Sequence, residues 1–193
     1  SSSSSVYGNQ ETLPLQEDMM PKPLSPYALQ KLAGEQYCFL YNRIHGMETV
    51  ALRYFNVYGS RMDPQGGYAM LIPKFAAMMR RGETPTINGD GNQTRDFTYV
   101  GDVVDANLRA ATTTNKNCFG KVMNIGSGRN LSVNQVVAMI NNALGTSILP
   151  HHGPPVVEPK NTQADITQAK NLLGWEPKMS FEAGIQQALA EYR

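Results

Sequence analysis

Strand-like and helical segments alternate along most of this chain, and no other feature constrains its fold as strongly. Residues 49–55 (T-V-A-L-R-Y-F) and 121–125 (K-V-M-N-I) are short segments with the β-branched and aromatic side chains that are typical of strands. Stretches with helical periodicity precede and follow both of them. A chain that alternates in this way builds a sheet covered by helices rather than a helical bundle. The sequence therefore predicts an α/β fold, and 193 residues suffice to bury a hydrophobic core.

Capping signals indicate where the expected helices begin and end. Ser25 followed by Pro26 is a strong helix start and Gly46 a typical left-handed stop, so we expect a helix over 26–45. Ser132 and Gln135 form a capping box for another helix, which ends at Gly145. The remaining expected elements are helices over about 69–81, 102–112, 164–173 and 181–192, strands over 86–88 and 96–100, and turns at 89–91 and 126–128.

Charge and cysteine content exclude several classes of protein. Seventeen basic and sixteen acidic side chains leave a formal charge of +1, which provides no basic footprint for nucleic acid or an anionic membrane. No apolar run approaches the length that crosses a bilayer. Cys38 and Cys118 stand alone, so the sequence indicates neither a metal site nor a disulfide framework. We therefore expect a cytoplasmic protein with no metal ion, and no nucleic acid or membrane as its partner.

Tyr27 and Lys31 form the pair of residues most suited to acid–base chemistry. Side chains four residues apart on a helix lie on one face, one turn from each other. An ammonium group close to a tyrosine favours the phenolate, which makes the spacing Tyr-x-x-x-Lys a sensible general base pair. The alternative interpretation of the same pair is an ordinary solvated helix face.

Further motifs accompany this pair, in order along almost the whole chain. S-S-S-V-Y-G (3–8) precedes it, S-P-Y-A (25–28) introduces it, and R-Y-F-N-V-Y-G (53–59) follows. Together they resemble the extended short-chain dehydrogenase/reductase family, and within it the NAD-dependent UDP-sugar 4-epimerases. Shorter matches that extend the resemblance are Asp63-Pro64, Tyr68, Ile72-Pro73-Lys74, Asn88-Gly89-Asp90-Gly91, Arg95-Asp96-Phe97, Ala164-Asp165-Ile166 and Leu173-Gly174-Trp175-Glu176-Pro177.

The resemblance implies a fold and a division into domains. The fold is the C-terminal part of a Rossmann-like, doubly wound parallel sheet together with a small α/β domain that binds the substrate. Residues 1–60 then correspond to the remainder of the NAD-binding domain, and the serine run at 1–5 to the end of a core strand. Residues 61–193 correspond mainly to the nucleotide-sugar domain, with a segment at about 86–125 that returns to the sheet.

The resemblance also implies roles for individual residues. Ser3, Tyr27 and Lys31 correspond to the catalytic residues, with Tyr27 as the base. Tyr27 and Lys31 also correspond to cofactor contacts, as do Tyr54 and Val57, for which ordinary strand packing is the alternative interpretation. The residues that correspond to substrate contacts are Ser4, Asn56, Leu71, Thr86, Asn88, Arg95, Glu158 and Thr162, and among these Arg95 matches the arginine that grips the substrate diphosphate.

The activity that the resemblance implies is inversion of the 4-hydroxyl of a UDP-hexose or UDP-N-acetylhexosamine through a 4-keto intermediate, with NAD as cofactor. Dehydratases, decarboxylases and reductases of the same family are the alternatives. The dehydratases and decarboxylases carry acidic residues just after the catalytic hydroxyl, where this chain has Ser4 and Ser5, and this favours epimerisation. A small Thr162 is similar to members that admit N-acetylhexosamines, so glucose and N-acetylglucosamine both remain open.

Two departures from the family pattern affect the expected activity. The stretch 154–160 lacks the arginine that grips the second phosphate in the family. The Gly-rich loop that cradles the cofactor pyrophosphate is absent from this sequence, and the turn at 126–128 does not replace it. We therefore expect the chain to be part of something longer, and the isolated chain to be inactive and not to retain NAD. A non-catalytic remnant remains the alternative.

The helix over 26–45 is expected to serve two surfaces. Leu29, Leu32, Ala33 and Leu40 are expected to face the sheet, and Tyr37 and Tyr41 to face a second copy of the chain. The resemblance thus implies a homodimer formed through the helix that carries Tyr27 and Lys31.

Overall fold

The centre of the molecule is a three-stranded parallel sheet, seen in a computed structural model that describes residues 1–63, 71–156 and 158–190. Its strands are β1 (Ser2–Ser3), β2 (Val50–Tyr54) and β7 (Lys121–Ile125), in the order β1-β2-β7. Ser2 pairs with Arg53, and Arg53 pairs with Asn124. The predicted strands over 49–55 and 121–125 are confirmed, and the serine run supplies the third strand of a parallel sheet, as the resemblance implied.

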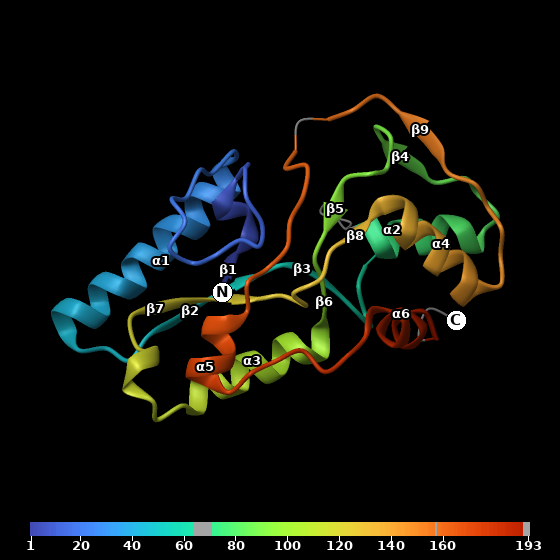
Figure 1. The fold of residues 1–193 in the computed structure, drawn as a ribbon. Helices are drawn as coiled ribbons and strands as arrows, with labels where there is room; N and C mark the ends of the chain where they lie inside the picture. Colours follow the sequence, from blue (N-terminus) through green and yellow to red (C-terminus); the bar gives the residue numbers. More distant parts are fainter. Residues whose placement is uncertain (64–70, 157, 191–193) are drawn as a thin grey trace.

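Helices cover both faces of this sheet (Figure 1). On one face lies α1 (Pro26–His45), which packs on β1 and β2; on the other lie α3 (Val100–Thr112) and α5 (Thr167–Leu173). Met123 and Ile125 of β7 are fully buried among the side chains of the α3–α5 layer, together with Trp175. Burial on both faces is the usual environment of parallel strands, and it accounts for apolar side chains such as Leu52, Met123 and Ile125 in β2 and β7.

The ends of α1 agree with the capping signals in its sequence. The Ser25 hydroxyl accepts a hydrogen bond from the Ala28 N–H at 3.1 Å, and Pro26 occupies the first turn. Gly46 ends the helix at φ +67°, where its N–H donates to the carbonyl oxygens of Tyr41 and Asn42. The predicted helix over 26–45 is confirmed.

The face that α1 turns toward the sheet differs from the prediction. Leu29 and Leu40 were expected inside but are 58% and 43% exposed, and Ala33 is exposed as well. Leu32 is the one residue of that predicted set that packs inward, against the core cluster around Phe55.

The physical reason for this difference is an ion pair in the interior. The buried residues of α1 are Ala28 and Glu35, and the Glu35 carboxylate pairs with the guanidinium of Arg53 on β2. A prediction based on apolar side chains alone does not place a charged residue such as Glu35 on the buried face, so it assigned the wrong face of α1 to the sheet. Tyr37 and Tyr41 are exposed, in agreement with their predicted place on the outer surface.

A second group of elements lies beside the sheet, at the right of Figure 1. Its helices α2 (Leu71–Arg80), α4 (Val133–Leu144) and α6 (Phe181–Ala190) share one hydrophobic core. That core also contains Tyr58, whose ring meets those of Phe97, Tyr99 and Phe181. The short strands of this second group form three pairs: β3 (Asn56–Tyr58) with β6 (Phe97–Tyr99), β4 (Thr86–Asn88) with β9 (His151–Gly153), and β5 (Thr94–Arg95) with β8 (Leu131–Ser132). Elsewhere in the described residues, two short 3₁₀ helices span Ser4–Tyr7, after β1, and Lys116–Cys118, before β7.

Some element boundaries differ from those expected. α3 begins at Val100, two residues earlier than expected, and the preceding strand is correspondingly shorter. α5 begins at Thr167 rather than 164, because the Asp165 side chain accepts from the Thr167 N–H while the preceding residues pair with Leu15. The capping box of Ser132 and Gln135 is present as predicted. The expected helix ends at 69–70 and 191–192, together with Pro64 and Tyr68, lie outside the described residues.

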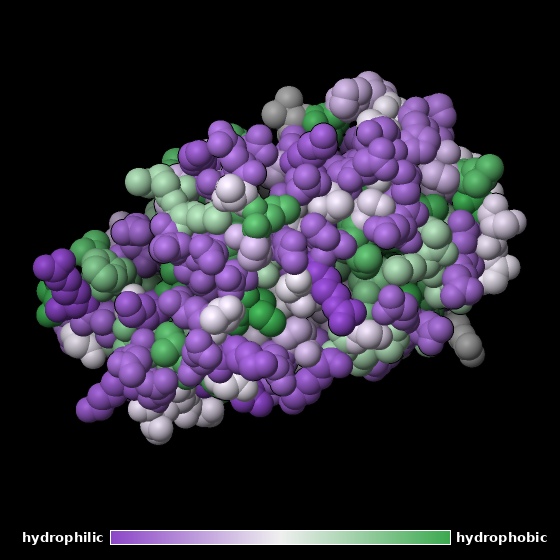
Figure 2. Space-filling view, viewed as in Figure 1, coloured by the Kyte–Doolittle hydropathy of each residue, from purple (hydrophilic) through white to green (hydrophobic). Residues whose placement is uncertain are grey.

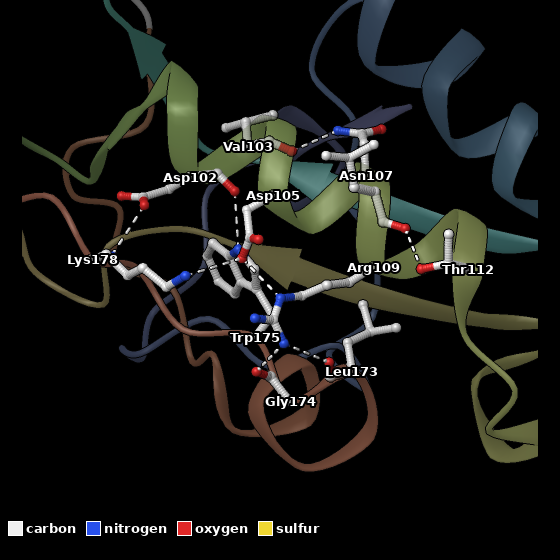
Figure 3. A network of polar contacts seen from close by, with 11 residues as sticks. Asp102, Val103, Asp105, Asn107, Arg109, Thr112, Leu173, Gly174, Trp175 and Lys178 are labelled. Carbon is white, nitrogen blue, oxygen red and sulfur yellow. Dashed lines mark hydrogen bonds and ion pairs between the residues drawn. The ribbon is translucent and has the colours of Figure 1, made fainter.

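Hydrogen bonds fasten the segment at 173–179 to α3 (Figure 3). The Trp175 indole N–H donates to the Asp102 carbonyl oxygen at 2.9 Å. The Asp102 carboxylate accepts from the backbone N–H groups of Lys178 and Met179, and Arg109 donates to the Gly174 carbonyl oxygen. The L-G-W-E-P stretch therefore ties the C-terminal segment to the helix beneath the sheet.

The surface view in Figure 2 is mostly hydrophilic, with hydrophobic residues in small groups, some of them at the end of the molecule where α1 lies. Among the described helices, none combines the length and the apolar character needed to cross a membrane.

The close approach of two loops at Gly8 gives a test of this fold. Gly8 has φ +61°, and a Cβ added there would lie 1.8 Å from the Lys22 carbonyl oxygen. We expect Gly8→Ala to destabilise the protein by at least about 2 kcal/mol, because a backbone clash adds to an unfavourable φ. The measurement is the midpoint of urea unfolding.

The matched control for this prediction is Gly34→Ala in α1, where nothing lies within 4 Å of the added Cβ. Alanine in a helix is favoured over glycine by up to about 1 kcal/mol, so this variant should be at least as stable as the wild type. Equal stability of the two variants would contradict the described packing of Gly8.

Candidate functional site

A cavity of about 360 Å³ lies where β1 and β2 end and the second group of elements begins. Ser3 and Tyr54, the last residues of the two strands, lie in its wall. The carboxyl ends of parallel strands are the usual place of a ligand site in such sheets. The cavity brings together nine residues that the sequence predicted for the site: Ser3, Ser4, Tyr27, Tyr54, Asn56, Val57, Arg95, Glu158 and Thr162.

Tyr27 and Lys31 lie one turn apart on α1, as their spacing predicted. The Lys31 ammonium is 5.7 Å from the centre of the Tyr27 ring, which lines the cavity and is 48% exposed. Lys31 also donates to the carbonyl oxygen and the hydroxyl of Ser1, at 3.1 and 3.3 Å. The lysine thus connects the first turns of α1 to the start of β1.

The hydroxyl of Ser3 lies at the point where β1 turns into a 3₁₀ helix. Its oxygen accepts hydrogen bonds from the Ser5 backbone N–H at 3.2 Å and from the Ser5 hydroxyl at 2.9 Å. Because Ser3 accepts in both bonds, its own proton remains available for donation to a bound group. The serine run therefore supplies both the end of β1 and the start of the 3₁₀ helix, with Ser3 as its N-cap.

Tyr54 and Val57 contribute both to the cavity and to the core. The Tyr54 hydroxyl donates to the side-chain oxygen of Asn107 on α3 at 2.8 Å. Tyr54 and Val57 both pack against the hydrophobic cluster that contains Trp175. Strand packing and a role in the cavity wall are therefore compatible at these two positions.

Arg95 lies at the cavity wall on β5, and its side chain is 11% exposed. Its guanidinium pairs with the Glu158 carboxylate at 2.7 Å and donates to the carbonyl oxygens of Thr94 and Lys160. These contacts hold a permanent positive charge beside the cavity, in the fork geometry that suits a phosphate group.

Sequence reasoning missed the residue that organises this wall, Asp96. Its carboxylate is fully buried and accepts four hydrogen bonds, from the Ser127 N–H and hydroxyl at 2.6 and 2.7 Å and from the Gly128 and Ala164 N–H groups at 3.0 Å. Burial raises the pKa of Asp96, while the four donors each favour its ionised form. An acidic residue between Arg95 and the apolar Phe97 was the available sequence signal.

The bonds to Asp96 join three segments that are far apart in the chain. They fix the turn at 126–128 and the strand-like segment at 162–164 against β5, and the Asp96 N–H itself donates to the Thr162 hydroxyl at 3.2 Å. Gly126 is required at the turn because a Cβ there would lie 2.4 Å from that of Ala164. Gly126 therefore allows the turn to pack against the segment that carries Ala164.

Three predicted substrate contacts are not among the residues that line the cavity. Leu71 begins α2 and packs against the core of the second group of elements. Thr86 and Asn88 lie on β4, where both are exposed and share one face of the strand. Their proposed nucleotide contacts stay predictions.

Among the described residues, no group of three or more His, Cys, Asp or Glu side chains is arranged to hold a metal ion. His152 instead lies 2.9 Å from the carbonyl oxygen of Gly89, between β4 and β9.

The parallel sheet and the tyrosine–lysine pair at its carboxyl edge define a Rossmann-like α/β protein of the short-chain dehydrogenase/reductase type. Residues 1–126 match the family described as "NAD dependent epimerase/dehydratase family". The chain belongs to this family, and NAD is the cofactor with which structural neighbours in the family are solved.

Individual relatives agree with this assignment. The chain is 36% identical to a UDP-glucose 4-epimerase of Mycolicibacterium smegmatis, over 100% of the chain and 61% of the relative. It superposes with a TM-score of 0.94 on a UDP-glucose 4-epimerase of Thermotoga maritima solved with UDP-glucose, at 38% identity over 100% of the chain and 62% of that protein. A UDP-glucuronic acid 4-epimerase of Bacillus cereus, in complex with UDP-glucuronic acid and NAD, gives a TM-score of 0.90 at 38% identity over 98% and 59% of the two chains. The chain thus spans about 60% of the length of its relatives.

The buried carboxylate gives a test of the described wall. We expect Asp96→Asn to destabilise the protein by about 2–4 kcal/mol, because an amide NH₂ would face N–H donors and the charge-assisted bonds would be lost. Chemical denaturation measures this, with Asp90→Asn as control, since Asp90 is exposed in the turn before β5 and its carboxylate accepts from Asn92 of the same turn. A loss no larger for Asp96→Asn than for the control would contradict the four-bond arrangement.

Proposed function

We propose that the protein to which this chain belongs inverts the 4-hydroxyl of a UDP-hexose or UDP-N-acetylhexosamine in an NAD-dependent reaction. The observation that carries the proposal is the cavity itself, because it brings Ser3 and Tyr27 together with Arg95 and Glu158 from distant parts of the chain. An acid–base group on one side and a phosphate-binding cation on the other are the two requirements of a reaction on the sugar of a nucleotide-sugar.

In this proposal Tyr27 is the base that removes the proton of the 4-hydroxyl. The Lys31 ammonium lies beside its ring, and the Ser3 hydroxyl donates a hydrogen bond to the sugar oxygen as the carbonyl forms. The same groups then return the proton after the ketone has presented its other face. Bound NAD supplies the hydride acceptor and donor for carbon 4 of the sugar.

The residues present fit such a cofactor. An ammonium has three N–H donors, and the contacts of Lys31 with Ser1 occupy two of them, so one remains for a ribose hydroxyl. Tyr54 and Val57 offer an apolar wall of the cavity to the nicotinamide ring. We assign no pyrophosphate contact to the residues of this chain.

Substrate contacts follow from the opposite wall. Arg95 is proposed to bind the diphosphate, which would replace the Glu158 carboxylate on its guanidinium and free Glu158 for a ribose hydroxyl. Ser4, Asn56 and Thr162 line the space that remains for the sugar. The small Thr162 leaves both hexoses and N-acetylhexosamines as candidates.

The charge of the cavity favours an epimerase over the dehydratases of the same family. Among the described lining residues, Glu158 carries the one carboxylate, and it is paired with Arg95. The residues after Ser3 are the neutral Ser4 and Ser5, so no acidic group beside the catalytic hydroxyl supports proton removal elsewhere on the sugar. A decarboxylase or reductase of the family, and a non-catalytic remnant, remain the alternatives.

The proposed division of labour and assembly extend this function. Residues 1–60 would serve the cofactor, and residues 61–193 mainly the nucleotide-sugar. A homodimer through α1 would cover outward side chains such as Tyr37 and Tyr41, which are 65% and 47% exposed. The assignment to the cytoplasm stays a prediction.

The role of Tyr27 can be tested in the full-length protein. Tyr27→Phe should abolish turnover of UDP-glucose and UDP-N-acetylglucosamine but leave their affinity near that of the wild type, because the phenol acts mainly in the transition state. Steady-state kinetics and calorimetric titration separate the two effects. Tyr41→Phe, on the outer face of α1, is the matched control. A parallel loss of affinity and turnover would show that Tyr27 is structural.

The role of Lys31 predicts a loss of turnover when its charge is removed. In Lys31→Ala the Tyr27 side chain loses the ammonium that lies 5.7 Å from its ring centre, so turnover of the UDP-sugar should fall. Steady-state rates test this, with Lys31→Arg as the variant that keeps the charge and should lose less activity. Unchanged turnover in Lys31→Ala would mean that the lysine does not act together with the tyrosine.

A further inference from the structure

A row of polar side chains crosses the interior of the parallel sheet, where apolar side chains are usual. Ser2, Arg53 and Asn124 are paired across β1, β2 and β7, and all three are buried. A buried polar group is costly unless its hydrogen bonds are made, and a buried guanidinium needs a compensating charge. Each of these three side chains therefore needs a hydrogen-bond partner inside the protein, and Arg53 also needs a negative charge.

Glu35 of α1 supplies the compensating charge. Its carboxylate receives two parallel bonds from Arg53, from Nε to Oε1 at 2.9 Å and from Nη2 to Oε2 at 2.8 Å. The Ser2 hydroxyl donates to the same Oε1 atom. A bidentate pair of this kind fixes both the distance and the direction of approach.

The surroundings of Arg53 complete the network. The guanidinium lies 4.6 Å from the centre of the Tyr7 ring and donates to the Glu17 carbonyl oxygen at 3.4 Å. Burial raises the pKa of Tyr7 to about 12, so its hydroxyl stays protonated and donates to Asn124 at 2.6 Å. Every member of the polar row thus has a partner.

The spacing along α1 connects this network to the candidate site. Tyr27, Lys31 and Glu35 follow one another at intervals of four residues, so they form one stripe of the helix. On the strands, Ser2 immediately precedes Ser3 and Arg53 immediately precedes Tyr54. On the strands, the network is therefore one residue away from the site. On α1, Glu35 is one helical turn from Lys31 and two turns from Tyr27.

Hydrophobic packing cannot fix α1 in this position by itself. Its buried residues are Ala28 and Glu35, and its large apolar side chains such as Leu29 and Leu40 are exposed. Burial of apolar surface has no direction, and Ala28 and the partly buried Leu32 offer little of it. The bonds of Lys31 to Ser1 are exposed, whereas the bonds of Glu35 to Ser2 and Arg53 are buried and directional, and they set the helix against the strand ends.

We propose that Glu35 is a positioning residue, which acts through Arg53 and Ser2 to hold Tyr27 and Lys31 opposite the Ser3 hydroxyl. The proposal rests on the proposed function for its effect on turnover. Its geometric content, the place of Tyr27 relative to β1, does not depend on which reaction the protein catalyses.

The experiment compares three variants of the full-length protein. Glu35→Gln leaves the buried guanidinium without a charge partner. The double variant Glu35→Leu with Arg53→Met removes both charges and fills the space with apolar atoms, a replacement that buried ion pairs often tolerate without loss of stability. Glu48→Gln, at an exposed position after α1, is the control and should leave activity unchanged.

A positioning role predicts that the double variant melts cooperatively near the wild-type temperature but turns over up to about 100-fold more slowly, as expected for misplaced reacting groups. Its KM for the UDP-sugar should change little, because Arg95 and Glu158 lie on other elements. If Glu35 served only to stabilise the fold, the double variant would recover kcat together with stability, and that result would overturn the proposal. If the double variant does not fold, Glu35→Asp, which keeps the charge on a shorter side chain, replaces it in the same comparison.

A spectroscopic readout separates this proposal from the proposed function. With ¹³C-labelled tyrosine, the Tyr27 ring signal, assigned by its loss in Tyr27→Phe, should move in the double variant while that of Tyr58 stays in place. A moved Tyr27 signal supports the positioning role even if the wild type proves inactive on UDP-sugars. An unmoved signal would overturn it, whatever the activity.

Discussion

Parallel pairing of β1, β2 and β7 is the constraint on which the rest of this structure depends, because it brings the carboxyl ends of the strands to one edge. Ser3 and Tyr54 end their strands there, and the chain then turns into the second group of elements. The cavity forms between these two parts. A slip of β1 by one residue would turn Ser3 to the α1 face of the sheet and remove it from the site, and a slip of β2 would do the same to Tyr54.

Two buried carboxylates hold the two walls of the cavity to this edge. Glu35 joins α1 to β1 and β2, and Asp96 joins β5 to the turn at 126–128 and to the segment at 162–164. Each accepts several charge-assisted hydrogen bonds, which have direction as well as strength. The apolar clusters supply most of the burial, but contacts of this kind decide where Tyr27 and Arg95 lie relative to each other.

The buried Glu35 also explains the unusual surface of α1. A helix whose inward face is used for Ala28, Glu35 and the partly buried Leu32 leaves its other large apolar side chains outside, and Leu29, Tyr37 and Ile44 are all more than half exposed. Exposed apolar surface on this scale is typical of a face that another element or another copy covers.

The sequence by itself determined the features that depend on neighbours along the chain. The ends of α1 and α4, the strands over 49–55 and 121–125, and the one-turn spacing of Tyr27 and Lys31 all follow from local propensity, capping and helical geometry. The resemblance of its motifs to a known family predicted the family to which the chain belongs. Only the tertiary structure decided which face of α1 is buried and that Asp96 anchors the cavity wall, since both depend on charged groups whose partners, Arg53, Ser127 and Ala164, come from distant segments. A buried charge looks like a surface residue in the sequence until the fold supplies its partner.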